Sequence, residues 1–226
     1  LQDADAALRI EASAKAYLLR AEVLREMEQY EQALLAFDEA LALDPGLSEE
    51  LFPSRWAAAR KAGDQQRLIA LSNVYATAHP ADPVRHYYLA WVPFQNDSHL
   101  QSINMLRRGI ALAQDQPAVL WYLLGRSYTG IEAWREAILS LETARDLLER
   151  GDESMLAHTD VPMGELAVAL GRAYLGDYRC TDAAAMLAHG MSLGAPMSEH
   201  LDALERARAC PTPTPTVPPW ATPTAE

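Results

Sequence analysis

The stretch that decides the fold runs from Ala14 to Leu47 and reads AKAYLLRAEVLREMEQYEQALLAFDEALALDPGL. Apolar side chains recur at three- and four-residue intervals on both sides of a short polar segment, which predicts two amphipathic helices joined by a turn. Asp44-Pro45-Gly46 ends the second helix, because proline cannot continue a helix and glycine favours a turn. The stretch therefore predicts one unit of two antiparallel helices.

This unit recurs along the chain, and the repetition is the strongest signal in the sequence. WYLLGRSY from Trp121 followed by WREAILSLETA from Trp134 is a close match, and LGRAY from Leu170 followed by DAAAMLAHGMSL is another. Three small residues at spacings of 12 and 7 mark four of the units, at points where helix backbones approach too closely for a larger side chain. The triplets are Ala21, Ala33 and Ala40; Ala90, Ser102 and Gly109; Gly125, Ala137 and Ala144; and Gly171, Ala183 and Gly190.

With this spacing the chain resembles the tetratricopeptide repeat family, over residues 14–196. The resemblance implies an all-α, right-handed superhelical solenoid of about five antiparallel helix pairs. The second pair, between Leu47 and Pro83, is degenerate. Two frames remain open for its three marker positions: Ala58, Ala70 and Thr77, or Trp56, Leu68 and Tyr75.

The segments around the repeats have their own patterns. Residues 1–13 are expected to form an N-terminal helix or the end of a preceding helix, and the insertion from Gly151 to Met163 is expected to lengthen a loop or a helix end. Residues 197–210 predict a capping helix with the polar outer face that a solenoid end needs. Residues 211–226 are rich in Pro and Thr, which predicts a disordered, extended tail. Such a tail is either a spacer of the kind found in bacterial surface and secreted proteins or a frayed terminus.

Composition narrows the classes of partner. The chain has 19 Lys plus Arg against 31 Asp plus Glu, a net charge of −12, which repels phosphate backbones and argues against nucleic acid as a ligand. No run approaches the roughly 18 to 20 apolar residues of a membrane span, so no direct membrane insertion is expected. Because the chain begins at Leu1 rather than Met, we expect that a preceding piece, such as a signal peptide or anchor, was removed.

No arrangement of residues predicts catalysis. HExxH, GxSxG, GxxxxGK[ST] and GxGxxG are all missing from the sequence. The six histidines, at positions 79, 86, 99, 158, 189 and 200, form no i, i+4 pair for chelating a metal and are interpreted as surface or cap residues. We therefore expect no enzyme activity, no catalytic residue, no cofactor and no metal site.

The resemblance places function on the concave surface, where the first helix of each unit exposes the side chains that it does not use for packing. The matching positions predict a partner-binding groove that is aromatic and locally basic, formed by Arg60, Lys61, Tyr87, Trp91, Phe94, Tyr122, Arg126 and Arg172. The alternative is that the rings pack against neighbouring repeats. Family members that grip a carboxylate use a Lys and Asn set, and Leu18, Tyr87 and Tyr122 stand where such a Lys is expected.

These features favour a protein–protein interaction scaffold or peptide-binding module, in an extracytoplasmic or cell-surface setting. The alternative is a cytoplasmic regulatory module of a larger enzyme or transcription regulator. Helices of nearly equal length, 181–193 and 198–210, would bring Cys180 and Cys210 level on an antiparallel return, which predicts a disulfide. Two unpaired thiols in a reducing cytosol are the competing interpretation.

Overall fold

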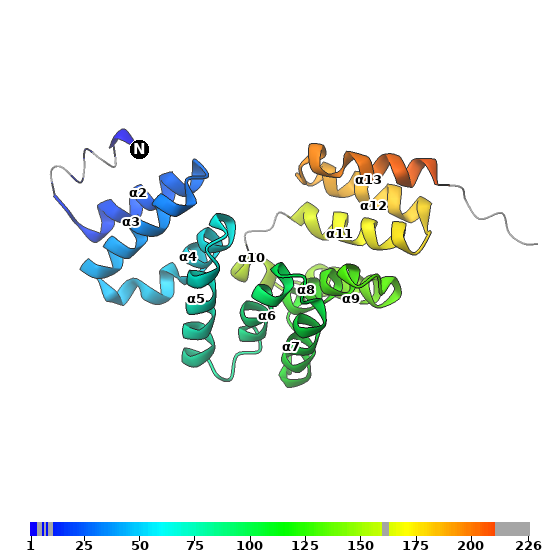
Figure 1. Cartoon of the computed structure of the whole chain (residues 1–226), viewed down its shortest axis with the longest axis horizontal. Coiled ribbons are helices and arrows are strands. Elements are labelled where there is room, and N and C mark those ends of the chain that lie inside the picture. The colour runs from blue at the N-terminus through cyan, green and yellow to red at the C-terminus, as the bar shows by residue number, and fades with distance from the viewer. Residues whose placement is uncertain (4–5, 7, 9–10, 160–162, 211–226) are drawn as a thin grey trace, which may run out of the picture.

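The computed structural model describes residues 1–3, 6, 8, 11–159 and 163–210, which form helices and turns without any strand. Each long helix packs against the next one along the chain, and Figure 1 shows the helices following one another in an arc from α2 to α13. The predicted all-α solenoid is confirmed. The predicted Pro/Thr tail at 211–226, residues 160–162 of the insertion and part of the 1–13 segment lie outside the described residues.

The long helices pair in chain order. The pairs are α2 (Ala14–Glu26) with α3 (Tyr30–Leu43), α4 (Ser48–Ala62) with α5 (Gln65–Ala78), α6 (Arg85–Gln95) with α7 (His99–Leu112), α8 (Ala118–Gly130) with α9 (Trp134–Glu149), and α11 (Met163–Gly176) with α12 (Cys180–Ser192). A 3-10 turn, η1 (Pro45–Leu47), precedes α4; a short helix, α10 (Ser154–His158), follows α9; and α13 (Met197–Ala209) ends the described part of the chain.

The turn inside each pair has one shared geometry. A residue with a left-handed backbone ends the first helix, and the amide of the residue after it bonds back to the fifth carbonyl before it, as Gln29 N does to Leu24 O at 2.9 Å and Arg179 N to Tyr174 O at 2.8 Å. The left-handed residues, with φ between 55° and 70°, are Glu28, Gly63, Asp97, Glu132 and Tyr178.

This geometry fixes the register of the second unit. In the other four units the left-handed residue lies five positions before the second small residue, as Glu28 does before Ala33. Gly63 lies five positions before Leu68, so Trp56, Leu68 and Tyr75 hold the three marker positions. The frame through Ala70 and Thr77 is wrong, because both residues are exposed.

All twelve small residues of the four predicted triplets are buried, as their packing role requires. Gly171 shows the reason: a Cβ atom added there would lie 2.8 Å from Leu187 Cγ and 3.0 Å from Leu187 N. In the second unit, Trp56 fills the corresponding space and its indole N–H donates to Ser72 Oγ at 3.1 Å. Small residues therefore let α11 and α12 approach closely, whereas α4 and α5 are held apart by a ring.

The chain departs from the repeat pattern after α9 and after α12. The insertion does not simply lengthen a loop, because it contains the separate helix α10, which contacts α8. At the other end α13 packs on α12 and α11 through its buried Ala203, Leu204 and Ala207. Cys180 and Cys210 are joined by a disulfide, with their Cα atoms 5.9 Å apart.

Candidate partner-binding groove

Aromatic rings from the first helices of successive units pack against one another. Trp56 of α4 contacts Tyr87 and Trp91 of α6, with ring centroids 5.5 and 5.6 Å apart. Tyr87 and Tyr122 are fully buried and Trp91 is 2% exposed. The prediction that these three side chains are open to a partner is therefore wrong, although Tyr122 still lies in the wall of a hollow described below. Adjacent first helices lie close enough for these rings to fill the space between them.

Arg60 and Lys61 lie at the C-terminal end of α4. The Arg60 guanidinium lies 5.1 Å from the centre of the Trp91 ring, a distance at which a cation and a ring attract each other. Lys61 is exposed. Neither residue is brought to the hollow described next, so this part of the prediction has no counterpart in the site.

Four of the predicted residues do come together, in a hollow between α6, α8 and α11. The residues that line it are Phe94, His99, Tyr122, Arg126, Thr129, Gly130, Glu165, Val168, Ala169 and Arg172. Arg126 lies against the aromatic part of this surface, with its guanidinium 4.9 Å from the centre of the Phe94 ring. Arg126 Nη1 also donates to Tyr122 Oη at 3.2 Å.

Burial keeps Tyr122 in its neutral form beside this arginine. Desolvation raises the pKa of the Tyr122 phenol, and the nearby Arg126 opposes that rise only in part. The hydroxyl is therefore an uncharged acceptor for Arg126 rather than a counter-ion. The guanidinium consequently keeps its charge available to an anionic group that enters the hollow.

On the other wall of the hollow, the terminal helix holds Arg172 in place. Arg172 Nη2 donates to His200 Nδ1 at 2.9 Å, and His200 Nε2 lies 3.2 Å from Glu165 Oε1. His200 lies in the cap helix, which the interpretation of the histidines as surface or cap residues allows, but it is only 4% exposed and so does not belong to the polar outer face expected of that helix. A guanidinium carries only hydrogen-bond donors, so Nδ1 of His200 must be the acceptor. The protonated Nε2 then donates a hydrogen bond to Glu165.

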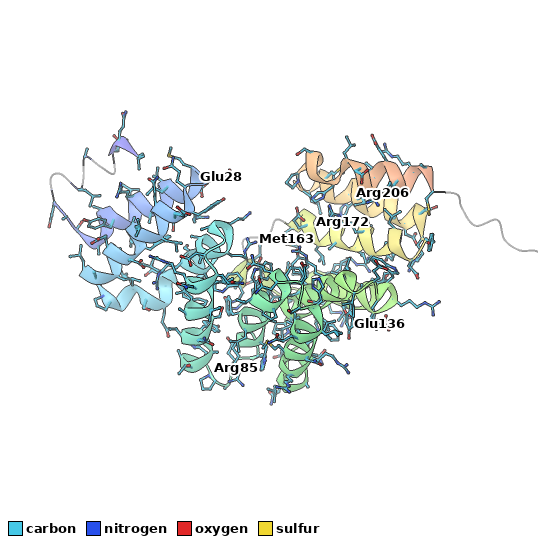
Figure 2. All side chains as sticks on the ribbon, viewed as in Figure 1. Glu28, Arg85, Glu136, Met163, Arg172 and Arg206 are labelled. Carbon is cyan, nitrogen blue, oxygen red and sulfur yellow. A yellow bond between two sulfur atoms is a disulfide. The ribbon has the colours of Figure 1, made fainter. Side chains whose placement is uncertain are left out.

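A second hollow adjoins the first and extends toward α13. It is lined by Thr129, Trp134, Arg172, Leu175, Gly176 and Arg206, and it shares Thr129 and Arg172 with the first hollow. Figure 2 labels Arg172 on α11 and Arg206 on α13, which belong to the same end of the solenoid. We call this surface, formed by both hollows, the arginine trough. Its arginines are Arg126, Arg172 and Arg206, and the only carboxylate lining it among the described residues is Glu165.

Sequence reasoning missed Glu165, His200 and Arg206. Glu165 precedes the positions that match the family groove, and His200 and Arg206 belong to the terminal helix, which is outside the repeats. A pattern of repeats contains no signal for a contact between α11 and the helix that caps it. The six-residue spacing of His200 and Arg206 does not predict a shared site either, because residues on one helix face recur at three, four and seven positions.

The comparisons with known proteins agree with this architecture. Residues 14–47 match the tetratricopeptide repeat model. No curated protein sequence matches the chain. The fold of the chain is that of tetratricopeptide solenoids, as the following solved structures indicate.

Three of these structures are similar to nearly the whole chain at low sequence identity. The APC/C hetero-tetramer Cut9–Hcn1 has 17% identity and a TM-score of 0.72, over 91% of this chain and 38% of that one. Yeast Tom70 has 19% identity and a TM-score of 0.59, over 92% and 42%. A thermophilic TPR protein of Thermus thermophilus has 20% identity and a TM-score of 0.61, over 88% and 98%. The chain thus spans less than half of the length of the first two chains.

Proposed function

We propose that this chain is a protein-interaction scaffold that binds an acidic segment of a partner protein in the arginine trough. The observation that carries the proposal is the convergence of Arg126, Arg172 and Arg206 from three different helices on adjoining hollows. The rest of the protein is acidic, with a net charge of −12, so a local concentration of arginine is not a by-product of composition. Guanidinium groups pair with carboxylates through two parallel hydrogen bonds.

The aromatic wall of the arginine trough indicates which other side chains the acidic partner segment carries. Phe94 is half-buried beneath Arg126, and Leu175 contributes apolar surface at the other end. Aromatic and arginine side chains dominate binding energy at protein interfaces. A partner segment with acidic residues around an apolar or aromatic side chain fits this lining best.

A titration with a defined probe tests the proposal. The probe is a short fluorescein-labelled peptide of glutamates around one phenylalanine, and its control is the same peptide with lysines. Arg126→Ala and Arg172→Ala should each weaken binding about 5- to 150-fold, which corresponds to roughly 1 to 3 kcal/mol. Arg107→Ala, an equal loss of charge at an exposed position of α7, should leave it unchanged. Equal binding of the lysine peptide would contradict the proposal.

We also propose that the scaffold works outside the cytoplasm. The Cys180–Cys210 bridge supports this setting, because disulfides persist in oxidising compartments. The Pro/Thr-rich composition of residues 211–226 is consistent with a spacer on a surface or secreted protein. None of the described helices has the length and apolar character that crossing a bilayer requires. Quantifying free thiols in the natively isolated, denatured protein tests this setting, and two titratable thiols would contradict it.

A further inference from the structure

The short helix α10 is not part of the repeat array. It follows α9 in the chain and turns back to the N-terminal ends of α6 and α8, where two hydrogen bonds hold it. Val119 N–H donates to Ser154 Oγ at 3.1 Å, and Tyr88 Oη lies 2.9 Å from His158 Nδ1. Figure 1 shows α10 on the inner side of the arc, between α4 and α8.

Aromatic rings from α4, α5 and α6 gather beside α10, where they line the hollows next to it. Phe52 lies 4.9 Å from Tyr88 and 4.7 Å from Tyr75, measured between ring centroids, and Trp56 lies 5.0 Å from Tyr88. Aromatic side chains supply large and rigid contact area, which is why they are enriched at protein interfaces. This surface is separate from the arginine trough, which begins at Phe94.

Open hollows lie on both sides of α10. One is lined by Arg25, Pro53, Ser54, Trp56 and Ala57 together with Leu156, Ala157, His158 and Thr159. The other is lined by Ser48, Glu49, Phe52, Pro53, Val74, Tyr75, Ala78, His79 and Tyr88 together with Ala157 and His158. Ala157 and His158 form a wall of both hollows.

The contacts of α10 itself are few. Met155 is 1% exposed and is its one buried side chain, whereas Leu156 is 70% exposed. A helix of five residues is far too short to be stable alone, so α10 is helical only because the surface holds it. A competing segment therefore has to replace one apolar anchor and two hydrogen bonds.

We infer that the surface formed by Phe52, Trp56, Tyr75, Tyr88 and the amide of Val119 is a second docking site, which α10 occupies within the chain. Its partner is a short helical segment that presents a Met or Leu anchor and, three residues later, a side chain that hydrogen-bonds Tyr88. This chemistry is that of α10, in which Met155 and His158 lie on one helix face. Docking of the partner segment requires displacement of α10.

The test uses α10 as its own probe. The intact chain is compared with a variant in which residues 152–159 are replaced by an equally long Gly/Ser segment. A fluorescein-labelled peptide of residues 151–163 should bind the replaced variant at least about tenfold more tightly than the intact chain, because the site is then vacant. The same peptide with aspartate at the Met155 position should lose at least about tenfold in affinity, because the apolar contact is lost.

Each other outcome counts against the inference. Equal binding to both proteins, or binding to neither, would overturn it. Loss of cooperative unfolding in the replaced variant would show that α10 is a structural strap, and self-association of that variant would assign the surface to a second copy of the chain. A point variant gives an independent check: Met155→Asp should speed hydrogen exchange of the Val119 amide at least about tenfold, whereas Leu156→Asp, at an exposed site, should not. Because Arg126→Ala should leave this peptide's binding unchanged, the two proposed sites can fail separately.

Discussion

Arg172 in the groove and His200 on the terminal helix are joined by a 2.9 Å hydrogen bond between Nη2 and Nδ1. The terminal helix thereby does more than cover the apolar end of the solenoid. It positions one of the three arginines of the trough, and Glu165 in turn holds the other side of the same imidazole. The terminal helix and the arginine trough are consequently one structural unit.

Replacing His200 should therefore affect both stability and binding. His200→Ala removes both hydrogen bonds in a buried setting and should lower the free energy of unfolding by about 1 to 3 kcal/mol. It should also weaken binding of the acidic probe peptide, because Arg172 is no longer held in place. His200→Gln, which can still offer an acceptor to Arg172, should lose less of the binding. Urea unfolding and the peptide titration measure the two effects, and Arg208→Ala on the exposed side of α13 is the control.

The small-residue spacing predicts a sharp contrast between two alanines of α12. Ala183 is fully buried against α11, whereas Ala185 is exposed. Leucine and alanine have similar helix propensities, so Ala183→Leu should destabilise the protein by about 1 to 3 kcal/mol through overpacking, while Ala185→Leu should change stability by less than about 0.5 kcal/mol. Thermal or urea unfolding of the pair would decide the matter. A similar loss in both variants would mean that close approach of the helices is not the cause of the pattern.

The fold could be predicted from the sequence because its cause is local and repeated. Small residues at a fixed spacing reflect helix contact within one unit, and that contact recurs four times. Whether Tyr87 and Trp91 face a partner or a neighbour depends on how closely α4 and α6 approach, which no single unit encodes. The docking of α10 depends on a bond between residues 70 positions apart, Tyr88 and His158, and the insertion carries no repeat pattern that could indicate it.

Tyr178 carries backbone strain that a glycine would relieve. Its φ is 60° and the residue is 77% exposed, so a large side chain occupies a left-handed position that disfavours any Cβ atom and gains little packing in return. Gly63 already holds the equivalent position in the second unit. Tyr178→Gly should raise the free energy of unfolding by about 0.5 to 1 kcal/mol in urea titrations. Asp177→Gly, one residue earlier and without a positive φ, should be neutral or destabilising.

Acidification should release α10. Burial lowers the pKa of His158 below its ordinary value of 6.5, with Asp82 and Asp152 opposing the shift, so docked α10 favours the neutral imidazole. Tyr88 on the other side of the bond stays a neutral phenol, because burial raises its pKa. Released His158 binds protons more readily than docked His158. Docking is therefore fully present above about pH 6.5 and weakens as the pH falls below that value.

Hydrogen exchange of the Val119 amide, followed between neutral and mildly acidic pH and corrected for the intrinsic exchange rate, measures this release. Protection should fall on acidification in the natural chain, whereas His158→Gln, which cannot titrate, should lose most of that dependence. His189→Gln, at an exposed position of α12, is the matched control and should behave like the natural chain. A pH dependence that survives in His158→Gln would assign the effect to another group.

The bridge between Cys180 and Cys210 should stabilise the C-terminal end and report the compartment of the protein. It closes a loop over a sequence separation of 30, so reduction should cost roughly 3 to 4 kcal/mol in the chain-entropy account, mainly by loosening α13 from α12. Since α13 also carries His200 and Arg206, reduction should weaken binding of the acidic probe peptide as well. Cys210→Ser should reproduce both effects without reductant, and Ala209→Ser at the neighbouring exposed position should reproduce neither.

Thiol quantification in protein taken from its native host and denatured without reductant should find no titratable thiol. Two titratable thiols would contradict the bridge. They would also remove its support for an extracytoplasmic setting, because a reducing cytosol keeps cysteines in the thiol form.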